Sequence, residues 1–285
     1  MPVNLLLCEG NGGSLDIQVL SAVLRGVGVE VKPEGSKHWL DNRILAYREI
    51  LSRGSGASVF GLRDGDFPDR PGEWSREENV VEWSISPDNN PIHLGWKWAR
   101  KEIENYLLDP TVVSRTLRFT EEEKREYSHL LDEAASEIRC SQAARMAVSA
   151  HRKGNFRIDN TFDRELTANE SDMREVLERR LEAHAARIAV RADAVIDEYN
   201  ALLPLCAPDG TIGQRYMYCF SGKDLCLNLW KAGRSLSVGQ RKLPNKGWMF
   251  GKVLEALRTT PDAHRLIPEW HSLREAMMSV DSSDN

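Results

Sequence analysis

Two aspartates flank a glycine where an apolar run ends, in the segment SVFGLRDGDF at positions 58–67. Because Asp64 and Asp66 lie on either side of Gly65, a tight turn could direct both carboxylates toward one site. Carboxylate oxygens are the ligands that Mg²⁺ prefers, and this ion binds through one or two protein groups while keeping several waters. Taken alone, a DxD segment is weak evidence for such a site, because it occurs more often as a surface turn, and this alternative stays open.

A third carboxylate follows the first apolar run of the chain, where Glu9 comes directly after NLLLC at positions 4–8. If both apolar runs are strands of one parallel sheet, their carboxyl ends meet at the same edge. Clustered carboxylates repel each other unless a cation neutralises them. The combination of Glu9, Asp64 and Asp66 therefore predicts a site for Mg²⁺ or Mn²⁺.

The segments that position these residues alternate between two patterns of apolar residues. Short apolar runs predict strands, and helical spacing of apolar residues predicts helices between those strands. Alternation of this kind favours a mainly parallel sheet with right-handed crossovers, which is an α/β, Rossmann-like class with flanking helices. The predicted strands are 4–8, 29–33 and 58–62, and the predicted helices are 15–26 and 39–53.

The rest of the chain predicts a helical hairpin inserted into this α/β unit. We expect an α/β core over 1–117, the helical hairpin over 118–204, and a C-terminal strand with helices over 205–285 that complete the core. In the core region we expect a strand at 80–85 and a turn into a helix over 94–110 that ends at Asp109-Pro110. The hairpin comprises long helices at 120–153 and 171–204. The C-terminal region comprises a strand at 215–220, a helix from 221, and two helices joined around Pro261.

A basic segment is present although the net charge of the chain is −5. No acidic residue occurs between Asp224 and Glu255, and such a segment suits a phosphate backbone. A solvated loop is the alternative. The residues that would contact nucleic acid are Lys231, Arg234, Arg241 and Lys242, and WKWARK at 96–101 could also do so unless Trp96 and Trp98 belong to the core.

Several classes of protein are disfavoured. SGKD at 221–224 is not a P-loop, because Met217 and Asp224 replace the required glycine and hydroxyl residue. Pro68 breaks the motif of haloacid-dehalogenase-type phosphatases, and the five scattered cysteines contain no CxxC pair and predict buried reduced thiols. No apolar stretch approaches the length of a membrane span, so we expect a cytoplasmic protein.

The order Glu9-Gly10, then DxD after a later strand, then IENYL at 103–107 resembles the TOPRIM domain of the OLD-type nucleases. The likeness covers residues 4–110 and is greatest to the stand-alone TOPRIM effectors of bacterial anti-phage systems such as PARIS. It implies a two-metal site with Glu9 as metal ligand or general base, Asp64 and Asp66 as ligands, and Glu104 as a further ligand, with Glu102 as its alternative. Lys223 would stabilise charge at the scissile phosphate. Asp16 matches the EGxxD aspartate only if the longer NGGSL spacing still lets it reach the site.

The resemblance implies a Mg²⁺- or Mn²⁺-dependent endonuclease acting on DNA or RNA, including tRNA, as a toxic effector beside a separate ABC-type ATPase. One rival hypothesis is a catalytically inactive TOPRIM-like binding module, in which the long Glu9–Asp16 spacing reflects lost activity. Another is a nucleotidyl-transferring enzyme of primase type. The oligomeric state is open, with a homodimer as one option.

Overall fold

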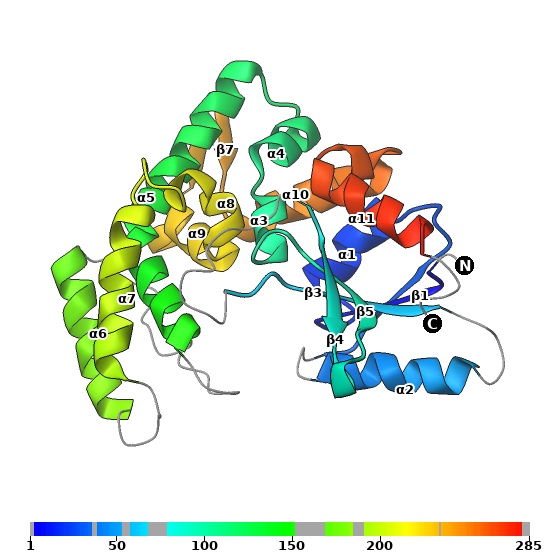
Figure 1. Cartoon of the computed structure of the whole chain (residues 1–285). Coiled ribbons are helices and arrows are strands. Elements are labelled where there is room, and N and C mark those ends of the chain that lie inside the picture. Colours follow the sequence, from blue (N-terminus) through cyan, green and yellow to red (C-terminus); the bar gives the residue numbers. More distant parts are fainter. Residues whose placement is uncertain are drawn as a thin grey trace. The chain divides into compact units, whose positions relative to one another are not determined.

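The computed structural model describes residues 3–35, 39–52, 58–67, 79–151, 169–184, 191–233 and 235–280. The chain forms two compact units (Figure 1). The first comprises 1–65, 77–120 and 247–285, and the second comprises 66–76 and 121–246. Residues 205–246, which the sequence-based division placed with the core, thus belong to the second unit.

A five-stranded sheet in the order β2-β1-β3-β5-β4 forms the centre of the first unit. Four strands are parallel, and only the edge strand β4 runs antiparallel to its neighbour β5. This confirms the predicted α/β class with a mainly parallel sheet. The elements are β1 (Leu5–Cys8), α1 (Leu15–Val23), β2 (Glu30–Pro33), α2 (Leu40–Ser52), β3 (Val59–Arg63), β4 (Val81–Ile85), β5 (Ile92–Lys97), α3 (Ile103–Leu107), α4 (Pro110–Leu117), α10 (Lys246–Thr259) and α11 (Pro268–Met278).

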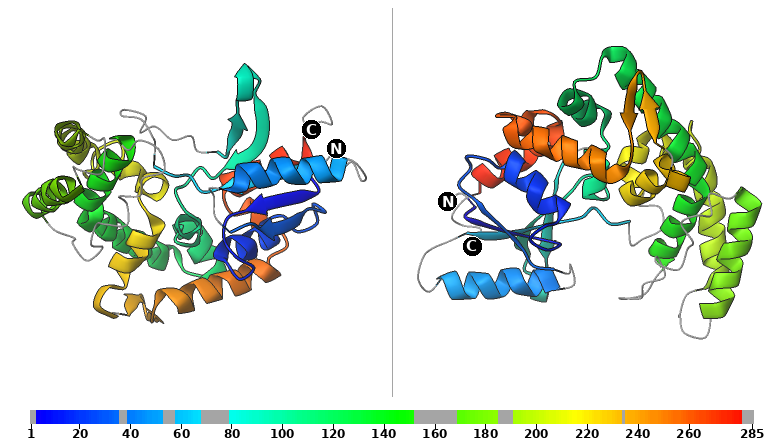
Figure 2. Two further views of the ribbon diagram at one scale, coloured as in Figure 1. Left: turned by 90° about the horizontal axis from the view of Figure 1, so that it is seen from below. Right: turned by 180° about the vertical axis from the view of Figure 1, so that it is seen from behind.

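The strand order explains why α1 and α2 cover opposite faces of the sheet (Figure 2). The connection from β1 through α1 leads to β2 on one side, and the connection through α2 passes back over β1 to β3. Right-handed crossovers in opposite directions place their helices on opposite faces. On the α2 face, Leu40 and Ile44 pack against Leu5, Leu7 and Val59.

Two glycines permit close packing at the centre of the sheet. A Cβ atom on Gly95 would lie 1.9 Å from the backbone oxygen of Gly61, and Gly95 has φ +145°. The pairing of β5 with β3 therefore depends on the absence of a side chain at Gly95. A Cβ atom on Gly61 would lie 2.5 Å from the Ile44 side chain of α2 and 2.8 Å from the Trp83 side chain of β4, so Gly61 leaves room for these two side chains.

The segment 94–110 differs from the sequence prediction. Residues Ile92–Lys97 form strand β5, and α3 ends at Leu107. Asp109 does not end that helix but begins the next one, because its carboxylate accepts hydrogen bonds from the N–H groups of Thr111 and Val112, with Pro110 in the first helical position.

The second unit is mainly helical and is built on the long helix α5 (Glu121–His151), which confirms the helix expected over 120–153. The helix expected over 171–204 is instead two helices, and these pack against α5 and against each other. The segment that joins the two expected long helices lies almost wholly outside the described residues. The other elements are α6 (Glu170–His184), α7 (Ala192–Leu205), α8 (Tyr216–Cys219), α9 (Gly222–Leu229), β6 (Leu236–Val238) and β7 (Arg241–Leu243).

The strand predicted at 215–220 is wrong. Tyr216–Cys219 is a short helix, in which the N–H of Phe220 donates to the carbonyl of Tyr216 at 2.8 Å. Tyr216, Met217 and Tyr218 are all half-buried, so this segment has none of the alternating burial of a strand. The strands of this unit are β6 and β7, which form a separate hairpin.

Candidate functional site

The carboxyl ends of β1 and β3 form the candidate site of the first unit. Because the chain leaves β1 toward one side of the sheet and reaches β3 from the other, the connections diverge here. Such a switch point is where parallel α/β sheets bind their ligands. Glu9 follows β1 and Asp64 follows β3, as the sequence predicts.

Glu9 and Asp64 are in contact. The backbone N–H of Asp64 donates a hydrogen bond to Glu9 Oε1 at 3.4 Å, and both residues are half-buried. This contact follows from the parallel register, which pairs Cys8 at the end of β1 with Leu62 near the end of β3. Two residues 55 positions apart in the chain are therefore brought to the same place.

Asp16 belongs to the same cluster. It lies in the first turn of α1, whose preceding Ser14 side chain caps the helix by accepting from the N–H of Ile17. Burial, together with the charges of Asp16, Glu9 and Asp64, raises the pKa of the Cys8 thiol to about 12. Asp16 thus lies near enough to Cys8 to act on its thiol, as Glu9 and Asp64 do, despite the long spacing between Glu9 and Asp16.

Glu104 lies in the helix that follows the adjoining strand β5. It is a buried residue of α3, which follows β5 and packs beside α1. Glu102, its alternative, has its carboxylate 3.5 Å from the Lys101 ammonium, and its backbone N–H donates to Asn105. Trp96 and Trp98 are core residues, so they do not form an aromatic surface for nucleic acid.

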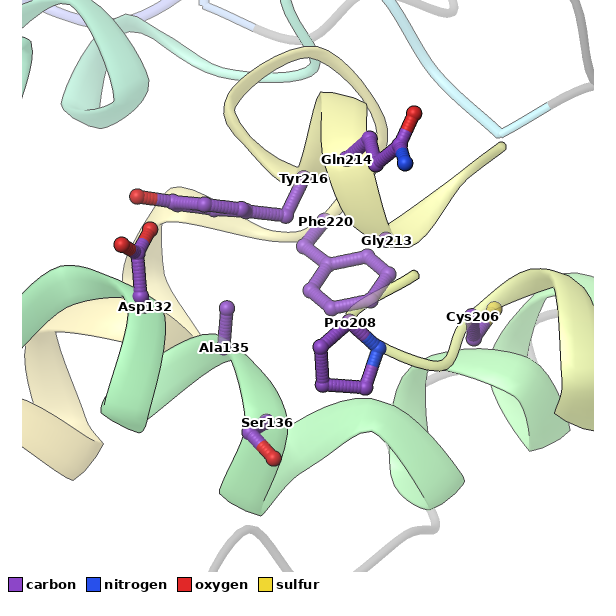
Figure 3. Close-up of a pocket in the computed structure, with 9 residues that line it drawn as sticks. All are labelled: Asp132, Ala135, Ser136, Cys206, Pro208, Gly213, Gln214, Tyr216 and Phe220. Atoms are coloured by element: carbon purple, nitrogen blue, oxygen red, sulfur yellow. The ribbon is translucent and has the colours of Figure 1, made fainter. Parts of the chain in front are cut away.

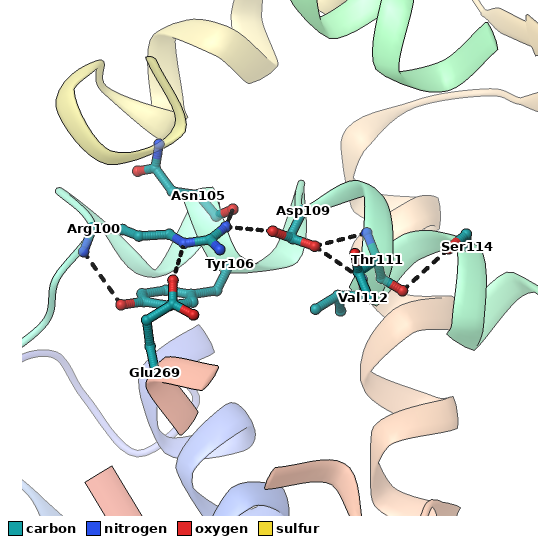
Figure 4. A network of polar contacts seen from close by, with 8 residues as sticks. All are labelled: Arg100, Asn105, Tyr106, Asp109, Thr111, Val112, Ser114 and Glu269. Carbon is teal, nitrogen blue, oxygen red and sulfur yellow. Dashed lines mark hydrogen bonds and ion pairs between the residues drawn. The ribbon is translucent and has the colours of Figure 1, made fainter. Parts of the chain in front are cut away.

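A buried ion network fixes the segment that leads from β5 into α3 (Figure 4). Arg100 is 4% exposed and pairs with Asp109 at 2.7 Å and with Glu269 of α11 at 2.8 Å. Its guanidinium also lies over the ring of Tyr106, 4.9 Å from the centroid. Sequence reasoning missed this network, because Arg100 and Glu269 are 169 positions apart.

Asp66 and Lys223 belong to the second unit. Asp66 is exposed and follows Gly65, which ends the first of the three segments of the first unit. Lys223 is half-buried in the first turn of α9, which Ser221 caps by accepting from the N–H of Asp224. The other predicted site residues, Glu9, Asp16, Asp64 and Glu104, belong to the first unit.

The basic segment is partly neutralised by α5. Lys231 forms an ion pair with Glu137, and Arg241 pairs with Glu123 at 2.9 Å. Lys242 is exposed on β7, and Arg234 lies outside the described residues. Contact with nucleic acid stays a prediction for these residues.

A cavity of about 250 Å³ in the second unit is the other candidate site (Figure 3). Burial raises the pKa of its Cys206 thiol to about 12, so this thiol is not a nucleophile near neutral pH. The cavity offers a surface for binding rather than a nucleophile with a base. Its lining comprises Asp132, Ala135, Ser136, Cys206, Pro208, Gly213, Gln214, Tyr216 and Phe220.

Three further findings concern the described residues. No three of their His, Cys, Asp or Glu side chains converge in a way that could hold a metal ion. None of the helices in the described part of the chain has the length and apolar character needed to cross a membrane. All five cysteines are buried and free of disulfides, as expected.

Comparisons with protein families, with curated proteins and with solved structures find no match to this chain.

Proposed function

We propose that this chain is a TOPRIM-like, metal-dependent phosphodiesterase that cleaves DNA or RNA, tRNA included. The observation that carries the proposal is the contact between Glu9 and Asp64 at the switch point of a parallel sheet. Asp16 adds a third carboxylate around Cys8. Such an arrangement of half-buried acids suits a cation better than a substrate anion.

The donor set fits Mg²⁺ or Mn²⁺. Mg²⁺ binds through one or two carboxylates and fills its other positions with water, so the pair Glu9 and Asp64 is sufficient to hold one ion. Asp16 would help to hold a second ion, and Glu104 is its candidate partner from the neighbouring helix. When bound, the cations would supply positive charge at the phosphate and acidify an attacking water.

The chain's own residues supply orientation and proton transfer. Glu9 accepts a hydrogen bond from Asp64, which directs its carboxylate across the strand ends. In that orientation Glu9 would take a proton from a water at the same edge, if it acts as the general base. Asp66 and Lys223 keep the functions that the resemblance implies, as ligand and as positive charge at the phosphate.

The test is cleavage of plasmid DNA and of total tRNA by the purified chain with Mg²⁺ or Mn²⁺. We expect cleavage by the wild type and a loss of roughly 100-fold or more in Glu9→Gln. Glu30→Gln is the matched control, because Glu30 is exposed at the amino end of β2, at the opposite edge of the same sheet. Failure of the wild type to cleave either substrate, or full activity of Glu9→Gln, would overturn the proposal.

The biological setting is proposed from the resemblance alone. In it the chain is a toxic effector of anti-phage defence that acts with a separate ABC-type ATPase. If so, expression of the wild type in phage-infected cells together with its neighbouring genes reduces plaque formation, and Glu9→Gln abolishes this protection. Equal protection by both forms would exclude a nuclease effector.

A second candidate is a catalytically inactive binding module with the same fold. It is favoured by the finding that no three metal-ligating side chains converge among the described residues. Calorimetric titration separates the two functions, because an inactive module without a metal site gives no heat with Mn²⁺.

A further inference from the structure

Helix α5 carries a buried polar network that holds the start of α9. Gln142 is fully buried, and its side chain accepts from the N–H of Ser221 at 2.9 Å and donates to Asp224 at 2.8 Å. Arg145, one turn further along α5, pairs with the same carboxylate oxygen of Asp224. The first turn of α9 is therefore fixed to α5 at both ends.

Arg145 has a second partner on its other side. Its guanidinium carbon lies 5.7 Å from the centroid of the Phe67 ring, and Phe67 is buried. Phe67 directly follows Asp66, and Asp224 directly follows Lys223. Each partner of Arg145 is thus adjacent in sequence to a predicted site residue.

Stability alone does not account for this pair. Arg145 and Asp224 are both less than 10% exposed, and taking two charges out of water costs several kcal/mol per ion. Replacing such a pair by residues without charge is often neutral or stabilising. Buried pairs of this kind are better explained where they fix the geometry of nearby groups.

We propose that Arg145, supported by Gln142, is a positioning residue that fixes Asp66 and Lys223 for phosphodiester cleavage. This inference rests on the proposed function. Phe67 anchors one end of the DGDF segment on Arg145, and Asp224 anchors the turn that carries Lys223 on the same guanidinium. A displacement of about 1 Å at either residue can lower a rate roughly 100-fold.

The experiment compares Arg145→Met with the double variant Arg145→Met/Asp224→Asn. The single change leaves a buried carboxylate without its cation, so the melting temperature falls. The double change removes both charges and keeps an acceptor for Gln142, so the melting temperature recovers toward that of the wild type. We expect its kcat for cleavage to stay at least about tenfold reduced, with KM little changed.

The conservative variant and the control sharpen this test. Arg145→Lys keeps the charge beside Asp224 but not the planar contact with Phe67, so its activity falls between those of the wild type and Arg145→Met. Arg174→Gln/Glu178→Gln removes an exposed ion pair of α6 and leaves cleavage unchanged. A double variant with wild-type stability and wild-type kcat would overturn the inference, because the network would then be structural only.

Hydrogen–deuterium exchange separates this inference from the proposed function. In Arg145→Met/Asp224→Asn we expect exchange to accelerate about tenfold both in peptides containing Phe67 and in peptides containing 221–224. This readout needs no nuclease activity. If the wild type does not cleave but both regions respond, the network stands and the nuclease proposal fails. If Phe67 does not respond, Arg145 does not hold the two segments together.

Discussion

The carboxylate of Glu9 accepts a hydrogen bond from the backbone N–H of Asp64, across the ends of two neighbouring parallel strands. The relationship requires both the register of β1 with β3 and the crossover that separates α1 from α2. It brings Glu9, which follows β1, and Asp64, which follows β3, together at one end of the sheet. Asp16, in the first turn of α1, acts with Glu9 and Asp64 to raise the pKa of the Cys8 thiol.

Loss of the negative charge of Glu9 or of Asp64 is predicted to weaken cation binding. Asp64→Asn and Glu9→Gln each replace a carboxylate by a neutral amide, so we expect the Kd for Mn²⁺ to rise at least about tenfold. Calorimetric titration of the purified variants measures this. Glu30→Gln, at the other edge of the sheet, should bind like the wild type. Equal affinity in all three variants would show that Mn²⁺ binds elsewhere.

The exposed lysine of β7 is predicted to contribute to nucleic-acid binding. Lys242 is exposed, whereas Lys231 and Arg241 form ion pairs with α5. If Lys242 contacts one phosphate of a single strand, Lys242→Ala lowers the slope of log affinity against log salt by about 0.7. Fluorescence anisotropy with single-stranded RNA measures the slope. The control is Lys252→Ala, which removes an ion pair with Glu255 of α10. This change should leave the slope of log affinity against log salt unchanged.

The network around Arg100 is predicted to be a large contribution to the stability of the first unit. Arg100→Met leaves Asp109 and Glu269 buried without their cation, and we expect a loss of roughly 3–5 kcal/mol in the free energy of unfolding. Urea denaturation measures the loss. Arg191→Gln removes an exposed pair with Asp193 and should leave the urea midpoint close to that of the wild type. A similar small effect of Arg100→Met would contradict the prediction.

The close approach of Gly95 to Gly61 makes a further prediction. Gly95→Ala places a Cβ atom against the backbone of β3, so the two strands must separate, and we expect a loss of more than about 3 kcal/mol. Gly251→Ala in α10 meets open space and should stabilise the chain by roughly 0.5–1 kcal/mol. The melting temperatures of the two variants test this difference, because Gly95 is required by the sheet and Gly251 is not. Similar melting temperatures would mean that the strands tolerate a side chain.

The strands and helices of the first sixty residues could be predicted because the spacing of their apolar residues is unambiguous. β1 is an uninterrupted apolar run, and α1 and α2 have helical spacing, so the strand ends and with them Glu9 and Asp64 could be placed from sequence. Strand β5 was missed, although Ile92, Leu94 and Trp96 alternate with His93, Gly95 and Lys97. This period of two was obscured by the helical IENYL segment that follows.

Contacts that join distant elements could not be predicted. Nothing in the spacing of Arg100, Asp109 and Glu269 indicates that they meet, because the contact depends on how α11 packs beside α3. The pairing of Arg145 with Asp224 depends in the same way on how α9 packs against α5. Local periodicity identifies the elements, but the polar contacts between elements follow from packing.

The pKa of Cys8 predicts how stability changes with pH. Burial, with the charges of Asp16, Glu9 and Asp64, raises this pKa to about 12, whereas an unfolded thiol titrates near ~8.5. The folded state thus keeps a proton that the unfolded state loses, so this contribution is complete below about pH 8.5 and is lost as the pH rises toward 12. The free energy of unfolding should fall by about 1.4 kcal/mol per pH unit within that window from this thiol.

Urea denaturation between about pH 8.5 and 10.5 isolates this effect when the wild type is compared with Cys8→Ala. Other groups that titrate there contribute equally to both proteins, so the difference in slope belongs to Cys8. We expect the slope of Cys8→Ala to be shallower than that of the wild type, because alanine has no proton for the unfolded state to lose. Parallel curves for wild type and Cys8→Ala would show that burial does not raise the pKa of this thiol and would contradict the prediction.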